Sequence, residues 1–141
     1  MNPGLIFAII TALVFGLWTV FHQKAAANIN SLFGAIIVSL TAVIIGTIIL
    51  IPSLKSSITF NSKGIAFAIL TGICALAVDV FALKAYGSGL AISVTGPIII
   101  GGSIAVAAFI GFFLGESLTL MKIVGLALVL VGAAILAAFT S

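Results

Sequence analysis

The stretch GIAFAILTGICALAVDVFALKAY at residues 64–86 decides the fold. It is apolar over nearly its whole length and long enough to cross a bilayer, because a spanning helix needs roughly 20 mostly apolar residues. The stretch also contains Asp79, one of only two acidic residues in the chain. An ionisable group inside a membrane-spanning segment is energetically costly and usually has a function. We therefore treat 64–86 as a transmembrane helix that carries a candidate functional residue.

The composition of the whole chain indicates a membrane protein. Of its 141 residues, 64% are hydrophobic and only 5% are charged, which leaves few polar residues to face water. Barrel strands alternate polar and apolar residues, whereas the long segments here are apolar on nearly every side. The sequence predicts an all-α membrane protein with one domain, 1–141. Its five transmembrane helices are expected at residues 4–27, 31–51, 64–86, 90–114 and 118–139.

Several functional classes are excluded by the residues that the chain lacks. The first apolar segment has no basic leader or small-residue cleavage site, so we expect it to remain as the first helix. Cys74 is alone and offers neither a disulfide nor a metal-ligand pair, which fits a small apolar filler. One histidine and two distant acids fit neither a metal site nor a catalytic triad, and no phosphate-binding loop is present. We expect no enzyme activity, no metal, no cofactor and no nucleic-acid partner.

The lysines give a weak signal for membrane orientation. With five spans, Lys55, Lys63 and Lys122 lie on the N-terminal side of the membrane, and Lys24 and Lys84 lie on the other. Orientation normally follows a clear excess of Lys and Arg in short cytoplasmic loops, and this chain has almost none. Two interpretations remain open. The chain has one orientation, weakly set by Lys55 and Lys63, or it inserts both ways and pairs antiparallel with itself.

Two polar stripes suggest where a site forms. One stripe in 64–86 follows helical spacing and contains Gly72, Ala75, Asp79, Ala82 and Tyr86. Another in 4–27 contains Thr11, Phe15, Trp18 and His22. Because these two helices run in the same direction, His22 and Asp79 are expected at similar depth and able to meet. Lys24 follows His22 by two residues and should point away from that stripe.

The helix expected at 90–114 contains Pro97 at a membrane depth similar to that of Asp79. Pro97 lacks an N–H group, so the carbonyl of Ser93 loses its helical donor and a kink is expected there. Broken helices at membrane depth are tolerated where they line a cavity, and transporters often bind substrate at such points. The candidate substrate- and proton-binding residues are therefore Asp79, His22, Trp18, Ser93, Pro97 and Tyr86.

Structural alternatives exist for each candidate. Asp79 can be a buried structural acid that is paired with Lys24 or Lys84, and His22 can mark the hydrated end of its helix. Trp18 can belong to the interfacial aromatic belt, and Pro97 can produce only a packing kink. Glu116 precedes the last helix, where an acid favours the helix N-terminus, and is interpreted as structural.

Spaced glycines mark the last helix as a packing helix. Gly125 and Gly132 are one heptad apart, and small residues allow helix backbones to approach closely in lipid. Whether they pack within the chain or across a dimer is left open by the spacing.

Two stretches near the end of the chain contain a more specific pattern: AISVTGPIII at 91–100 and LGESLTLMKIVGLALVLVG at 114–132. In these stretches the sequence resembles the EamA-like branch of the drug/metabolite transporter superfamily. There, a Gly-Glu-x-Leu-Thr turn before a final helix with spaced glycines is matched by Gly115, Glu116, Leu118, Thr119, Gly125 and Gly132. Most members of that family have ten helices in two inverted halves, so the resemblance implies that this chain is one half and pairs as an antiparallel homodimer. It implies contact near the last helices and one central substrate path.

The resemblance implies a secondary transporter in the cell membrane of a prokaryote, surrounded by lipid. It would move a small metabolite or cationic compound by alternating access around a midplane site. Two alternatives remain. The chain can be a non-transporting subunit of a larger membrane complex, with Asp79 in an intersubunit ion pair, or half of a heteromeric lipid-linked sugar flippase.

Overall fold

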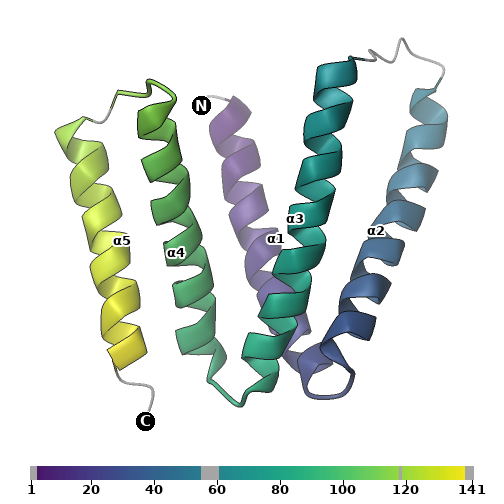
Figure 1. Cartoon of the computed structure of the whole chain (residues 1–141), viewed down its shortest axis with the longest axis horizontal. Coiled ribbons are helices and arrows are strands. Elements are labelled where there is room, and N and C mark those ends of the chain that lie inside the picture. Colours follow the sequence, from purple (N-terminus) through teal and green to yellow (C-terminus); the bar gives the residue numbers. More distant parts are fainter. Residues whose placement is uncertain (1–2, 55–60, 118, 139–141) are drawn as a thin grey trace. The chain divides into compact units, whose positions relative to one another are not determined.

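The described part of the chain is helical throughout its regular structure (Figure 1). The computed structural model describes residues 3–54, 61–117 and 119–138. In these ranges it has no strand, and its helices are α1 (Pro3–Ala26), α2 (Ser31–Ser53), α3 (Ser62–Gly87), α4 (Ile92–Phe113) and α5 (Leu120–Ala138). All five are long and apolar enough to cross a membrane. The all-α prediction is confirmed, and the predicted helix ends differ from these bounds by two residues at most. Lys55 and the predicted ends of the last helix, Leu118 and Phe139, lie outside the described residues.

Short polar and glycine signals set the helix ends. The Asn30 side chain caps α2 by accepting a hydrogen bond from the backbone N–H of Leu32 at 2.9 Å. Pro52 lies in the last turn of α2, and the helix ends one residue later. Gly89 has a φ of 89°, a left-handed conformation that other residues rarely adopt, and it turns the chain between α3 and α4.

In the link between α4 and α5, a glycine ends α4 and a threonine then caps α5. Gly115 also has a φ of 89°, and its N–H group donates to the carbonyl of Phe112 at 3.1 Å. The N–H group of Glu116 donates to the carbonyl of Gly111 at 3.0 Å, which completes a Schellman motif. Thr119 then accepts a hydrogen bond from the N–H group of Lys122 at 3.4 Å, and α5 begins.

Helix α4 is not interrupted at Gly96–Pro97. The helix runs continuously from Ile92 to Phe113 with Pro97 inside it. The expected break is therefore limited to the missing N–H group of one residue, and no segment is unwound. The physical reason is that Pro97 lies in the second turn, where the loss of one helical hydrogen bond leaves all later ones intact.

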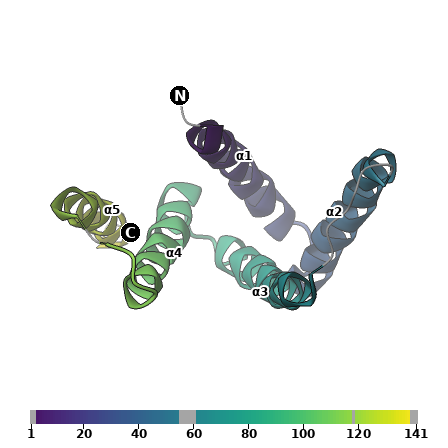
Figure 2. The ribbon, with the colours of Figure 1, turned by 90° about the horizontal axis from the view of Figure 1, so that it is seen from above.

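The chain forms two compact units. The first contains residues 1–21 and 88–141, and within it α4 packs on α5. The second contains residues 22–87, and within it α2 packs on α3, as Figures 1 and 2 show. The expectation of a single domain over 1–141 stays a prediction.

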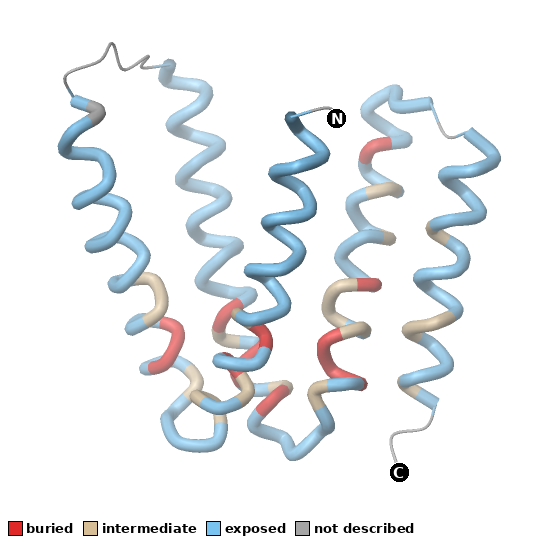
Figure 3. The backbone as a smooth tube through the Cα atoms, turned by 180° about the vertical axis from the view of Figure 1, so that it is seen from behind, coloured by how far each residue is buried: buried red, intermediate tan, exposed pale blue. Residues whose placement is uncertain are grey.

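Buried residues are few, as expected for helices whose outer surfaces face lipid. In the second unit they lie at the end of α1, in the first turns of α2 and in the last turns of α3 (Figure 3), where Ala35 is fully buried and Leu83 is 1% exposed. Helix α5 has no buried residue within its described length. Large apolar side chains are exposed along every described helix. A helix that is apolar all round is stable only when lipid or another chain covers it.

Close helix contact depends on glycines that spacing alone did not identify. A Cβ atom on Gly34 of α2 would lie 2.9 Å from Leu83 Cδ1 of α3, and one on Gly101 of α4 would lie 3.1 Å from Ala133 Cβ of α5. By contrast, a Cβ atom on Gly125 or Gly132 would meet nothing within 4 Å. Inside the chain, tight packing of α5 therefore uses Ala133 against Gly101, and Gly125 and Gly132 do not mediate it.

The first prediction concerns this packing. Replacing Gly34 by Val should reduce the free energy of unfolding by about 1–3 kcal/mol, because the new side chain needs space that Leu83 and Ile29 occupy. Gly46→Val in the same helix is the matched control, since a Cβ atom there has no neighbour within 4 Å. Unfolding of both variants in mixed micelles, followed by circular dichroism, compares them. Equal losses in the two variants would contradict close packing at Gly34.

Candidate functional site

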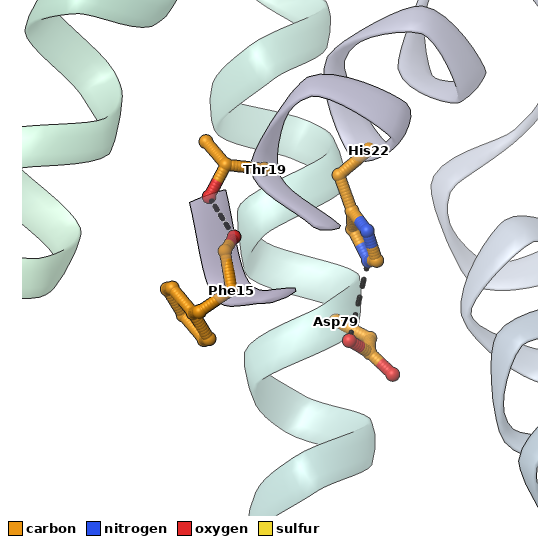
Figure 4. A network of polar contacts seen from close by, with 4 residues as sticks. All are labelled: Phe15, Thr19, His22 and Asp79. Carbon is orange, nitrogen blue, oxygen red and sulfur yellow. Dashed lines mark hydrogen bonds and ion pairs between the residues drawn. The ribbon is translucent and has the colours of Figure 1, made fainter. Parts of the chain in front are cut away.

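An ionisable pair lies in the second unit, between the last turns of α1 and the second half of α3. His22 Nε2 is 3.2 Å from Asp79 Oδ1, a distance that makes an ion pair when the imidazole is protonated (Figure 4). Both residues are buried, with His22 3% exposed and Asp79 8% exposed. The predicted meeting of these two residues is therefore present in the structure.

The helix ends bring the pair together. His22 precedes Ala26, the last residue of α1, by four positions, or about 6 Å along the axis. Asp79 precedes Gly87, the last residue of α3, by eight positions, or about 12 Å. A Cβ atom on Gly87 would lie 3.4 Å from the carbonyl oxygen of Ala26, so the two ends touch because Gly87 has no side chain. This contact holds the end of α1 against α3.

Part of the predicted stripe on α3 surrounds the acid. Ala82 and Tyr86, which belong to the stripe, follow Asp79 and are both buried. Gly72 and Ala75, which belong to the same predicted stripe, are exposed. The stripe is therefore a buried surface only in its second half. Periodicity identified the correct face of the helix but not how far along the helix its partners reach.

The lysines proposed as alternative partners do not pair with Asp79. Lys24 and Lys84 are both exposed. The ammonium nitrogen of Lys84 lies 5.7 Å from the centre of the Phe81 ring, which is a cation–π distance. In the part of the chain that the structure describes, the ion-pair contact of Asp79 comes from His22. The acid thus has a histidine, and not a lysine, as its partner in this contact.

The other predicted site residues divide between the two units. Tyr86 lies in the second unit with Asp79, whereas Trp18, Ser93 and Pro97 lie in the first. Trp18 stacks on Phe15 with ring centres 4.9 Å apart. Ser93 is exposed in the first turn of α4. The predicted convergence of all six residues on one site stays a prediction.

A cavity of about 450 Å³ lies in the first unit and has Pro97 in its wall. Its lining comes from α1, α4 and α5 and includes Gly16, Thr19, Gly96 and Gly132. A Cβ atom on Gly96 would lie 3.5 Å from Thr19 Cγ2, so α1 comes close to α4 at this point. Ser93 is not among the lining residues, whereas Pro97 is.

Thr19 is the residue that sequence reasoning missed. It is 6% exposed, and its hydroxyl group donates to the carbonyl of Phe15 at 2.9 Å (Figure 4). Thr11, Phe15 and Thr19 follow one another at steps of four, so helical spacing already placed Thr19 on the polar face of α1. The signal was present, but a threonine that bonds its own helix is hard to distinguish from a cavity wall by spacing alone.

The arrangement of the pair allows proton chemistry at membrane depth. The imidazole nitrogen of His22 and the carboxylate oxygen of Asp79 are 3.2 Å apart, so the two groups form an ion pair when the imidazole is protonated. Ionisable groups in transmembrane helices commonly mark ion and substrate pathways. Within the described residues, five helices that are long and apolar enough to cross a membrane, together with a buried ionisable pair, indicate an integral membrane protein with a candidate ion- or substrate-binding site.

Comparison with known proteins identifies the family. The chain belongs to the EamA-like transporter family, which matches it over residues 2–138. It is also similar to an uncharacterized protein of Methanocaldococcus jannaschii, with 30% identity over 132 residues that cover 94% of each chain. That relative is therefore almost the same length. No solved structure matches the chain.

Family membership gives the chain a transporter-like role in the membrane. The predicted resemblance and the five-helix form are confirmed. The structure also explains two residues of the Gly-Glu-x-Leu-Thr motif. Gly115 adopts the left-handed conformation that ends α4, and Thr119 caps α5.

The second prediction tests whether His22 and Asp79 are energetically coupled. In a double-mutant cycle of His22→Ala and Asp79→Ala, unfolding free energies should show a coupling of about 0.5–2 kcal/mol, because each single change leaves the other polar group without its contact. The cycle is measured by denaturant unfolding in mixed micelles.

The control for this cycle pairs Asp79→Ala with Lys84→Ala. Since Lys84 is exposed and lies over Phe81, no coupling above the error is expected. Coupling to Lys84 that equals the coupling to His22 would restore the interpretation of Asp79 as a structural partner of a lysine.

Proposed function

We propose that this protein is a secondary transporter that works as a dimer and exchanges a small metabolite or cationic compound by alternating access. The observation that carries the proposal is the buried His22–Asp79 contact at 3.2 Å within membrane-spanning helices. A structural acid can be satisfied by a single permanent cation. Asp79 instead contacts an imidazole, which is charged only when it is protonated, and ionisable pairs in membrane-spanning helices commonly mark proton and substrate pathways.

The transport step follows from the chemistry of the pair. When the imidazole is protonated, Asp79 is neutralised by its partner and binds no further cation. Loss of the imidazole proton leaves a carboxylate without a positive partner, which can then bind a cationic substrate. Because the imidazolium and a cationic substrate would neutralise the same carboxylate, binding of the substrate accompanies release of the proton. This exchange would couple substrate movement to proton movement in the opposite direction.

A dimer is supported by the surface of the chain. Helix α5 buries none of its described residues, and Gly125 and Gly132 have open space beside them within the chain. Small residues without a partner inside the chain suit close contact with a helix of another copy. The nearly even distribution of lysines supports antiparallel insertion, which would supply the inverted half that alternating access requires. We place this dimer in the cell membrane of a prokaryote.

The contact within the chain also bears on the alternative of a non-transporting subunit. That alternative used Asp79 in an ion pair between subunits. Since His22 of the same chain already contacts the acid, a second cation from another subunit is not needed to neutralise it. The contact therefore weakens this alternative.

The third prediction concerns coupling. Asp79→Asn should abolish flux, or make it independent of a proton gradient, because asparagine keeps the shape of the side chain but exchanges no proton. Flux is measured in liposomes against a metabolite panel, with and without a proton gradient, at matched protein content. Glu116→Gln is the control, because it neutralises the only other acid, which is exposed in the link between α4 and α5. If Asp79→Asn and wild type have the same flux and pH dependence, Asp79 is structural.

The fourth prediction concerns orientation. Single cysteines at Ala27 and Ser117, in a Cys74→Ala background, report opposite sides of the membrane when each helix spans it. Both positions should react with an impermeant maleimide from both sides in comparable amounts, because the lysine bias is too small to set one orientation. Blocking the outer population before lysis separates the two populations. Nearly complete labelling of each position from one side alone would exclude the antiparallel homodimer and leave a partner of another sequence.

A further inference from the structure

A second cavity in the first unit has side chains that offer hydrogen-bond acceptors but no donors. We call it the α1–α4 crevice, because it is lined by Ala8, Thr11, Ala12 and Phe15 of α1 and by Ile100 and Ser103 of α4. Its volume is about 460 Å³, which is within the range of small-molecule sites. None of its lining residues is charged, so the crevice cannot recognise a ligand by charge.

The two hydroxyl groups of the crevice already use their hydrogens. Thr11 donates to the carbonyl of Phe7 at 2.8 Å, and Ser103 donates to the carbonyl of Ile100 at 2.8 Å. A hydroxyl group that donates its single hydrogen still has lone pairs that accept hydrogen bonds. Toward a molecule in the crevice, Thr11 and Ser103 therefore offer acceptors and no donors.

The cavity of about 450 Å³ next to the crevice also has a hydroxyl group whose hydrogen is already used. Ile100 lines both the crevice and this cavity. In this cavity, the hydroxyl of Thr19 donates to the carbonyl of Phe15 at 2.9 Å. Along the face of α1, each of the two threonine hydroxyls thus has its hydrogen bonded to its own helix. The repeated pattern presents apolar walls with acceptor oxygens at intervals.

We propose that the α1–α4 crevice binds small organic compounds that carry an N–H or O–H group on an apolar body, with the hydroxyl oxygens of Thr11 and Ser103 as acceptors. This inference rests on the proposed transport function, for which the crevice would recognise the substrate. An N–H or O–H group buried in an apolar crevice is destabilised unless an acceptor meets it. The two hydroxyls therefore select for compounds with a donor, and the apolar walls select for the rest of the molecule.

Other classes of ligand match the lining of the crevice less well. A lipid acyl chain fits the apolar walls but has no donor for the hydroxyl oxygens. A permanent cation without N–H groups would find no acid among the lining residues. Hence the donor group of the ligand is the property to vary in a test.

The chain contains a built-in reporter for this test. Trp18 is the only tryptophan, and it stacks at 4.9 Å on Phe15, which lines the crevice. A ligand that contacts Phe15 changes the environment of the indole, and aliphatic probes do not interfere with its fluorescence. We therefore choose 1-adamantanol as the donor probe and 1-methoxyadamantane as its matched analogue, in which a methyl group replaces the hydroxyl hydrogen.

The fifth prediction is a difference between these probes. In phosphatidylcholine nanodiscs that contain the full chain, titration of Trp18 fluorescence should give about three- to tenfold tighter binding of the alcohol than of the ether, after correction for partition into empty nanodiscs. Thr11→Val combined with Ser103→Ala should remove this preference, because the oxygens are lost and the apolar shape is kept. Ala12→Leu should weaken binding of both probes, because it fills the crevice.

Thr47→Val is the matched control. The Thr47 hydroxyl donates to the carbonyl of Val43 at 2.7 Å, so its local bonding is like that of Thr11, but it lies in α2 of the other unit. This variant should keep the preference for the alcohol. Equal binding of alcohol and ether by wild type would overturn the proposal, as would a preference that survives removal of both hydroxyls. Ether binding that Ala12→Leu weakens would then indicate an apolar occupant such as a lipid chain.

Binding and transport can fail separately. Probe binding that follows these rules without flux of any compound would keep the crevice as a ligand site and contradict the transport function. Flux that depends on Asp79 but not on Thr11 and Ser103 would keep the transport function and contradict the crevice as the recognition site.

Discussion

The constraint on which this structure depends is that polar groups inside an apolar environment must bond to one another. All regular structure in the described residues is helical, so backbone groups are satisfied within each segment. The hydroxyls follow the same rule, because Thr11, Thr19, Thr47 and Thr71 each donate to a carbonyl one turn earlier. The acid at membrane depth, Asp79, cannot bond its own helix in this way. Its contact with His22 of α1 is therefore a polar interaction that joins two helices in the second unit.

Packing in the rest of the chain depends on which glycines have neighbours. Gly34 and Gly101 allow α2 to approach α3 and α4 to approach α5, and Gly87 allows the end of α3 to touch Ala26. Gly125 and Gly132 have no such neighbour inside the chain. Since lipid provides little driving force for helix association, close backbone contact at small residues is what stabilises a helix pair. Glycines without an internal partner are consistent with the dimer contact proposed here.

The chemistry of the chain is divided between its two units. The second unit holds the ionisable pair, which is suited to proton exchange, and the first holds two cavities with apolar walls and acceptor hydroxyls. A transporter needs both functions, because an energy-coupling group and a recognition surface serve different steps. In the proposed function, Asp79 and His22 provide coupling, and Thr11 and Ser103 provide selectivity. Each assignment has its own variants and measurements, so that one can be rejected without the other.

The sequence by itself determined the membrane character, the five helices and the family resemblance. Apolar length is a property of each segment alone, so the predicted ends differ from those of the structure by at most two residues. Helical spacing also placed His22 and Asp79 on faces that could meet. Only the tertiary structure decided that Asp79 contacts His22 instead of Lys24 or Lys84, and that Gly101 packs α4 on α5. The reason is physical: periodicity fixes the face on which a residue lies, whereas its neighbours depend on where another helix passes.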